Sequence, residues 1–283
     1  MSARRVLRQH AAYRDDIGDL VTRRPVPGPG IEHLDPFLFL NHHGPQTYPP
    51  NNRGLPFGPH PHRGFETVTF ILEGELAHRD SGGHESVIRA GGVQWMTAGS
   101  GLVHAELSPR GFMEKGGPLE IIQLWVNLPA RLKMTAPAYK GLDAADIPVV
   151  GAADGKAGVQ VISGAFGSAE GPFRSLTGLQ MMVVKLKAGG RLDLPAPSNR
   201  TVFLYVVKGT PTVSGTPVQE HHLVAMGDGD TVPLAGDGEA TLLFGHGEPF
   251  REPIVAHGPF VMNSREEIAQ AVSDYRSGRL GAL

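Results

Sequence analysis

Residues 65–72, with the sequence FETVTFIL, decide the fold class of this chain of 283 residues. Thr, Val, Phe and Ile occur there at the density of a β-strand, and Gly74 follows as a turn residue. Similar short runs follow it, separated by Gly or Pro, at residues 86–89, 93–97, 103–107 and 119–128. Strands this short and evenly spaced predict a β-barrel or jelly roll, and therefore an all-β protein.

The same strand pattern occurs again later in the chain. Residues 201–209 (TVFLYVVKG) resemble residues 67–74 (TVTFILEG), and residues 223–230 (LVAMGDGD) resemble residues 87–94 (VIRAGGVQ). Self-similarity of this kind indicates a divergent internal duplication. The length of the chain is sufficient for two domains that each bury a hydrophobic core.

The domain boundaries are expected where the strand pattern is interrupted. Residues 130–146 are rich in Ala, Lys and Pro without periodicity, which is typical of a linker. We therefore expect a first domain at residues 1–129 and a second at residues 147–283. Near the end, Ser264 and Glu267 form a Ser-x-x-Glu capping box before apolar residues at helical spacing, which predicts a short C-terminal helix that packs on its domain.

The composition excludes several classes of protein. Lys plus Arg is 26 and Asp plus Glu is 28, for a net charge of −2, and no run of basic residues suggests nucleic-acid binding. No apolar stretch approaches the roughly 20 residues that span a bilayer, and the first residues lack the apolar core of a signal peptide. We expect a cytoplasmic protein that binds neither nucleic acid nor membranes. Since the chain has no Cys, any metal must have N and O ligands.

Two short clusters carry metal-ligand side chains at positions i and i+2. They are His60-Pro61-His62 and His104-Ala105-Glu106. Alternate side chains of a strand share a face, so two neighbouring strands would present all four donors to one ion. Three imidazoles and one carboxylate suit a divalent first-row transition metal better than calcium or magnesium. The spacing predicts one mononuclear metal site.

The second copy lacks these ligands. Registering Gly209 on Gly74 places Pro195 and Pro197 opposite His60 and His62, so we expect no metal there.

Other polar residues are given structural interpretations. His42 and His43 are adjacent, so on extended backbone their rings face opposite ways and cannot share an ion. Gln94 precedes the second ligand cluster and is interpreted as core packing of a strand, with barrel wall or a place beside the metal ligands as the alternative. Arg63 and Glu66 are interpreted as a salt-linked strand end.

Several segments together resemble the pirins, a family in the bicupin branch of the cupin superfamily. The resemblance covers nearly the whole chain and is strongest from residue 59 to residue 106. It rests on residues 35–38 (DPFL), 59–68 (PHPHRGFETV), 99–106 (GSGLVHAE) and 258–263 (GPFVMN). It implies two cupin domains, each a jelly-roll β-barrel, with a single metal in the N-terminal one.

The resemblance also implies a ligand set and a reaction. The family's four metal ligands fall on His60, His62, His104 and Glu106, and the metal is usually iron. The same donors accept copper, nickel, manganese, cobalt or zinc. Several bacterial pirins are similar to quercetin 2,3-dioxygenases, which implies an enzyme that opens a flavonol ring with dioxygen and releases carbon monoxide. The ion would act as a Lewis acid on the flavonol 3-hydroxyl, whose proton Glu106 would accept as general base.

Two questions stay open at the level of sequence. Glu106 is either a permanent fourth ligand or the general base. The protein is either this dioxygenase or, as some pirins suggest, a regulator whose iron oxidation state changes the surface offered to a protein partner. A third possibility is an isomerase-like cupin that uses its metal only as a Lewis acid.

Overall fold

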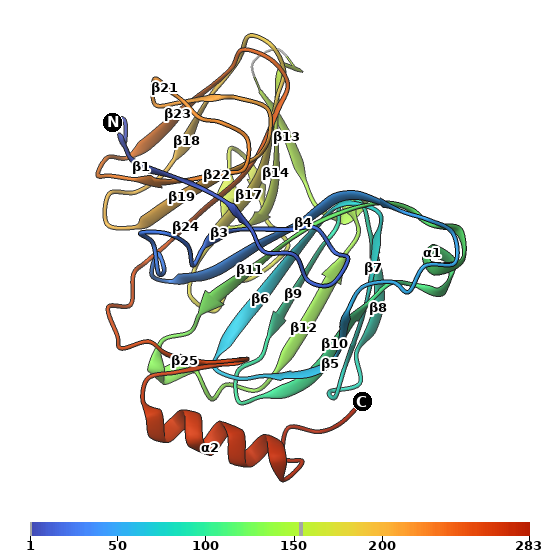
Figure 1. The fold of residues 1–283 in the computed structure, drawn as a ribbon. Helices are drawn as coiled ribbons and strands as arrows, with labels where there is room; N and C mark the ends of the chain where they lie inside the picture. The colour runs from blue at the N-terminus through green and yellow to red at the C-terminus, as the bar shows by residue number, and fades with distance from the viewer. Residues whose placement is uncertain (1, 153–154) are drawn as a thin grey trace. The chain divides into compact units, whose positions relative to one another are not determined.

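The computed structural model describes residues 2–152 and 155–283, and over this part the chain is built mainly from strands with two α-helices (Figure 1). It forms two compact units. The N-terminal barrel comprises residues 14–24, 37–145 and 250–283, and the C-terminal barrel comprises the residues up to 13, 25–36 and 146–249. Within the described ranges, neither helix is long and apolar enough to cross a membrane.

The N-terminal barrel consists of a seven-stranded and a four-stranded sheet. The larger sheet has the order β12 (Ala138–Leu142), β9 (Val93–Thr97), β6 (Phe65–Glu73), β11 (Gly117–Asn127), β4 (Phe37–Tyr48), β3 (Thr22–Val26) and β2 (Tyr13–Arg14). The smaller sheet has the order β5 (Phe57–His62), β10 (Leu102–Leu107), β7 (Glu75–Asp80) and β8 (Glu85–Arg89). Additional elements are the hairpin β25 (Val255–His257) and β26 (Phe260–Met262), the helices α1 (Arg110–Lys115) and α2 (Arg265–Arg276), and the 3-10 turns η1 (Ala130–Leu132) and η2 (Ala144–Asp146).

The C-terminal barrel repeats this arrangement. Its larger sheet has the order β1 (Val6–Ala11), β22 (His222–Met226), β19 (Thr201–Lys208), β24 (Ala240–Gly247), β17 (Gln180–Leu186), β14 (Ala157–Ser163) and β13 (Val149–Ala152). Its smaller sheet has the order β18 (Gly190–Pro195), β23 (Thr231–Gly236), β20 (Thr212–Val213) and β21 (Thr216–Pro217), and β15 (Ala165–Phe166) pairs with β16 (Ala169–Glu170).

The two barrels match in the details that the duplication predicted. β19 holds the same place in its sheet as β6 does in the other. Gly74 and Gly209 end these two strands with φ angles of 81° and 83°, a conformation that favours glycine. A Cβ atom would collide with a backbone oxygen at either position. The predicted all-β fold of two cupin barrels with a short C-terminal helix is thus what the structure contains.

The residues that make up each unit differ from those expected from domain boundaries at residues 129 and 146. β1, at the start of the chain, pairs antiparallel with β22 and completes the C-terminal barrel. Residues 138–142, expected in a linker, form β12 and pair with β9. Both are edge strands, which need only one partner and can be supplied from a distant part of the chain. Residues 250–283, including α2, cluster with the N-terminal barrel rather than with the second domain.

The C-terminal helix forms as its sequence predicts. Ser264 accepts a hydrogen bond from the backbone of Glu267, whose side chain accepts one from the backbone of Ser264 in return. Ile268 and Ala271 face inward and pack on Phe260 and Met262 of the neighbouring strand. The capping box therefore fixes the start of α2, and its apolar stripe fixes the face that is buried.

The interiors of the two barrels differ in polarity. The C-terminal barrel is filled by apolar side chains such as Leu204, Leu242 and Phe244. In the N-terminal barrel, an apolar cluster around Ile71 and Leu76 fills only part of the interior. The rest holds buried polar side chains, among them His62, His104, Glu106, Thr69 and Gln94. A polar site inside a protein requires compensating hydrogen bonds, which makes this half of the N-terminal barrel the candidate functional region.

Candidate metal centre

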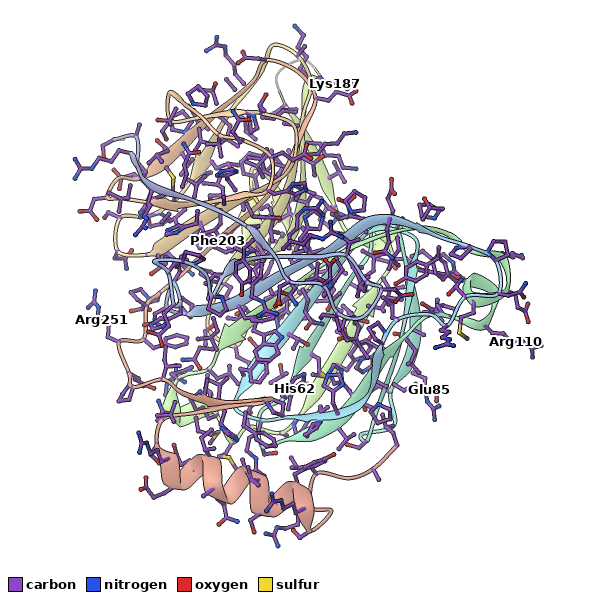
Figure 2. The ribbon with its side chains drawn as sticks, in the orientation of Figure 1. His62, Glu85, Arg110, Lys187, Phe203 and Arg251 are labelled. Carbon is purple, nitrogen blue, oxygen red and sulfur yellow. The ribbon has the colours of Figure 1, made fainter. Side chains whose placement is uncertain are left out.

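Two adjacent strands present the three histidines of the predicted site. β5 carries His60 and His62, and β10 carries His104 directly opposite His60 in the antiparallel ladder. Pro59 and Pro61 alternate with the histidines and cannot donate ladder hydrogen bonds, which is tolerated because β5 lies at the edge of its sheet. His62 and His104 are buried and His60 is half-buried. Figure 2 shows His62 among the strands of this barrel.

The three imidazoles form one compact group. Among the described residues, the ligand atoms of His60, His62 and His104 lie within 4.8 Å of one another. Nε2 of His60 and Nε2 of His104 are 2.9 Å apart. The ring centroids are separated by 4.4 to 4.9 Å. The i, i+2 spacing thus brings three of the four predicted side chains together.

Backbone carbonyls fix the tautomers of two of the rings. Nδ1 of His60 is 2.8 Å from the carbonyl oxygen of Gly58, and Nδ1 of His62 is 3.2 Å from that of Pro259. Because a carbonyl oxygen only accepts, each Nδ1 must carry the hydrogen and donate it. Nε2 of His60 and Nε2 of His62 therefore carry the lone pair rather than the hydrogen, which is the arrangement found in metal-binding histidines.

Burial keeps the inner rings neutral. It is the main reason why the pKa of His62 falls to about 3, and nearby His60 lowers it further. Burial and the neighbouring imidazoles likewise hold the pKa of His104 well below its usual value. A histidine must be neutral to bind a metal, so both rings are ready to do so at neutral pH.

The geometry fits a transition metal ion. Two nitrogen ligands with bonds of about 2.1 Å at a right angle would be about 3 Å apart, close to the observed 2.9 Å between the Nε2 atoms of His60 and His104. Without an ion, burying two imidazoles and half-burying a third with their nitrogens facing one another has no evident structural benefit. The donor chemistry suits iron and its first-row neighbours.

Glu106 lies on the same strand but outside the histidine group that the described residues form. Its two carboxylate oxygens accept hydrogen bonds from the amides of two glutamines. Gln94 Nε2 donates to Oε1 at 2.7 Å and Gln123 Nε2 donates to Oε2 at 2.6 Å. The Thr69 hydroxyl also donates to Oε1, at 3.2 Å. All three partners are donors, so both carboxylate oxygens of Glu106 act as hydrogen-bond acceptors.

The orientation of both glutamine amides is itself determined. The indole nitrogen of Trp125 donates to Oε1 of Gln123 at 3.0 Å, and the hydroxyl of Tyr139 donates to Oε1 of Gln94 at 3.2 Å. Each amide oxygen is thereby occupied, and each NH2 group faces Glu106. We call Gln94 and Gln123 the glutamine cradle. Gln94, interpreted from sequence as core packing of a strand, instead makes polar contacts beside the predicted ligand Glu106, which was the alternative interpretation.

A second polar chain runs beside the cradle and was not singled out from sequence. Nε2 of His78 is 3.0 Å from Asp80, and the same carboxylate is 3.0 Å from Nδ1 of His84, a half-exposed side chain. The ring of His78 stacks on Tyr139 with centroids 3.8 Å apart and lies 5.5 Å from His104. The i, i+2 spacing of His78 and Asp80 is the signal that could have found this chain, because it is the spacing of the ligand pairs.

The remaining candidates behave in part as expected. The rings of His42 and His43 diverge, His42 toward Glu120 at 2.8 Å and His43 toward the hydroxyl of Thr22 at 2.8 Å. The prediction of a salt bridge between Arg63 and Glu66 is wrong.

Each of these two residues has another partner. Arg63 instead binds Asp274 at 2.7 Å. Glu66 accepts a hydrogen bond from Thr97 at 2.6 Å, and burial raises its pKa to about 7. Arg63 lies in the connection between β5 and β6, whereas Glu66 lies within β6, and the bend at Gly64 separates their side chains.

An arginine contacts the segment of the C-terminal barrel that the internal register aligns with the first ligand cluster. The buried guanidinium of Arg4 donates to the carbonyl oxygens of Ala196 at 2.8 Å and Gly227 at 2.6 Å, and also to Pro197. Pro197 is the residue that the internal register aligns with His62. In this barrel, therefore, backbone carbonyls at the aligned position bind a side-chain cation.

Family models match both halves of the chain. The model described as Pirin matches residues 19–126, and the one described as Pirin C-terminal cupin domain matches residues 181–281. The first match contains all four residues of the predicted metal site.

Similarity to individual proteins extends over nearly the whole chain. A Pseudomonas aeruginosa protein provisionally named quercetin 2,3-dioxygenase is 44% identical over 249 residues, covering 88% of this chain and 87% of its own. A pirin-like protein of Caulobacter vibrioides is 41% identical and covers 94% of both chains. The crystal structure of a quercetin 2,3-dioxygenase from Acinetobacter baumannii is 33% identical and covers 99% of both chains with a TM-score of 0.93. On these matches, the chain belongs to the pirin family.

Proposed function

We propose that this pirin is a metal-dependent dioxygenase of the quercetin 2,3-dioxygenase type, which opens a flavonol ring with dioxygen and releases carbon monoxide. The observation that carries the proposal is the pairing of three converging imidazoles with a separately held carboxylate. Two relatives that bear the name of this enzyme support it, one of them similar over the whole fold. We place this activity in the cytoplasm.

His60, His62 and His104 are the proposed protein ligands, with iron as the proposed metal. When bound, the ion supplies a Lewis acid and a site for dioxygen chemistry. The carbonyls of Gly58 and Pro259 hold two of these rings in the tautomer in which Nε2 carries the lone pair. Three protein ligands leave coordination positions open, which is the property of a reactive site rather than a structural one.

Glu106 is the proposed general base. The glutamine cradle holds its carboxylate in one orientation and apart from the histidine group, which supports proton acceptance over permanent ligation. Its task is to take the proton of the flavonol 3-hydroxyl. A general base of this kind contributes about 10²- to 10⁴-fold to a rate.

Aromatic side chains border the histidines on the side of His62. The ring of Phe65 lies 5.0 Å from that of His62, and the ring of Trp125 lies 5.2 Å from it. Phe39 continues this surface, with its ring 4.7 Å from that of Trp125. Phe65 is fully buried, whereas Trp125 and Phe39 are partly exposed. Flat aromatic substrates gain affinity from partly exposed rings of this kind, which supports a flavonol-like compound.

The test is an aerobic flavonol assay with carbon monoxide detection on iron-loaded protein. We expect flavonol consumption matched by carbon monoxide, and a loss of at least about 100-fold in kcat for Glu106→Gln with its metal retained. Protein that holds iron but consumes no flavonol would reject the dioxygenase and leave the regulatory pirin as the candidate. Full activity of Glu106→Gln would reject the base.

A further inference from the structure

The C-terminal segment, residues 255–281, makes direct contact with a predicted metal ligand. The carbonyl oxygen of Pro259, between β25 and β26, accepts the hydrogen bond from Nδ1 of His62. The next residues continue the contact, since the backbone N–H of Val261 donates to the carbonyl of Arg63 at 3.1 Å. The buried ammonium of Lys133 donates to Gly64 and to Val261 and joins the same two stretches. The C-terminal hairpin thus sets both the tautomer and the backbone position of the second ligand.

Helix α2 holds the residue that follows this ligand. Arg63 Nη1 donates to Asp274 at 2.7 Å, and Arg63 Nε donates to the carbonyl of Ser100 at 2.6 Å. Ser100 lies in the turn that leads into β10, the strand of His104. One guanidinium therefore connects α2, the end of β5 and the start of β10.

The last residues of the segment make a second set of contacts near β10. The side chain of Leu280 occupies the space over Gly101, where an added Cβ would overlap it. The carbonyl of Leu280 accepts a hydrogen bond from Ser81 at 2.8 Å, and the same hydroxyl accepts one from the backbone of Val103 at 3.1 Å. Both ligand strands are consequently tied to residues 255–281.

Residues of the C-terminal segment itself orient Asp274 for its contact with Arg63. Gln270 Nε2 donates to its other oxygen at 2.6 Å, and Arg279 Nε does so at 2.8 Å. Hydrogen bonds from Arg63, Arg279 and Gln270 lower the pKa of Asp274 to about 2, so the carboxylate is charged at neutral pH. A charged carboxylate with hydrogen bonds from three neighbouring side chains gives the helix one defined attachment to Arg63.

We propose that residues 255–281 are a positioning element for the metal ligands, with Asp274 acting through Arg63, and that docking of this segment and metal binding stabilise each other. The inference rests on the proposed metal site. Groups that orient metal ligands commonly change metal affinity by about 10- to 100-fold. Coupling between two events is reciprocal, so the metal must also hold the segment in place.

The first arm of the test is metal affinity, measured with Co²⁺ by competition against a chelator. Asp274→Asn weakens Co²⁺ binding at least about tenfold and changes the visible absorption of the bound ion, which reports ligand geometry. Asp274→Glu, which keeps the carboxylate, recovers most of the affinity. Glu266→Gln is the matched control, because Glu266 is an exposed acid on the same helix, and it binds Co²⁺ like the unchanged protein.

The second arm uses the unchanged protein and stays decisive if Asp274→Asn fails to fold. Hydrogen exchange of the amides of α2 is compared without metal and with saturating Co²⁺, and we expect at least tenfold slower exchange with metal. Equal exchange in both states, or equal Co²⁺ affinity of Asp274→Asn and Glu266→Gln, overturns the inference. Unchanged protein that binds no Co²⁺ overturns the proposed metal site instead, so the two failures are distinguishable.

Discussion

Replacing Gln123 by Leu removes one half of the glutamine cradle while keeping a side chain of similar size. The lost interaction is the 2.6 Å hydrogen bond to Glu106 Oε2, and the indole N–H of Trp125 loses its acceptor at the same time. A hydrogen bond to a charged group contributes about 1.5–3 kcal/mol. Trp125 is partly exposed and can donate to water instead, so we assign the effect mainly to Glu106.

The expected consequence is a fall in kcat/KM of about 10- to 100-fold on a flavonol, equivalent to about 1.4–2.8 kcal/mol of transition-state stabilisation. Gln219→Leu, a change of the same kind at an exposed position, serves as the control. The measurement is steady-state flavonol consumption on proteins with equal metal content.

A double-mutant cycle shows whether Gln123 acts through Glu106. In a Glu106→Ala background, Gln123→Leu should have almost no further effect on kcat/KM. If Gln123→Leu stays within twofold of Gln219→Leu, or if its effect is unchanged when Glu106 is absent, the cradle has no catalytic role and our reasoning is refuted.

Three further predictions concern stability. Burial and the charges of Arg200 and Arg4 lower the pKa of His246 to about 3 in the folded protein, against about 6.5 in an unfolded chain. As the pH falls from about 6.5 to about 3, the unfolded chain therefore binds a proton at His246 that the folded protein does not bind. Between pH 7 and pH 5 the free energy of unfolding should therefore fall less for His246→Asn than for the unchanged protein. The difference is up to about 1.4 kcal/mol per pH unit. Urea titrations measure it, and equal pH dependence of the two proteins would contradict the prediction. Arg4→Ala should lower the free energy of unfolding by at least about 2 kcal/mol, because the contacts with backbone carbonyls are lost. The control Arg5→Ala, at an exposed neighbouring position, should change it by no more than about 0.5 kcal/mol. Equal losses for both variants in chemical denaturation would reject the role of Arg4. Gly101 has a φ of 117°, and a Cβ atom there would overlap Leu280. Gly101→Ala should therefore lower the free energy of unfolding by about 1–3 kcal/mol and make the last residues accessible to limited proteolysis. An unchanged digestion pattern would argue against the contact with Leu280.

Much of the fold follows from local sequence signals. The run that begins at Phe65 forms β6, and the capping box at Ser264 starts α2. β4 (Phe37–Tyr48) was not anticipated, because Gly44, Pro45 and two histidines interrupt its apolar pattern. β1 and β12 escaped detection because edge strands need little hydrophobicity, and their pairing partners are fixed by the tertiary fold.

The site was predictable to the extent that strand periodicity determines it. The i, i+2 spacing identified the three histidines that converge, because alternate residues on paired strands share a face. The same rule put Glu106 beside them, but the carboxylate is held by amides from β9 and β11, and the β5–β10 register shifts between His104 and Glu106. Gln94, Gln123 and Asp274 carry no motif, since a single polar side chain acquires its role only from the partner that folding places opposite it.

The most direct test of the central claim is the metal content of His62→Ala after loading with iron and desalting, measured by elemental analysis beside the unchanged protein. We expect about one ion per chain in the unchanged protein and a nearly metal-free variant, because removal of one of three converging imidazoles breaks the site. A His62→Ala protein that retains its full complement of metal would show that the histidines of β5 and β10 do not form the metal centre.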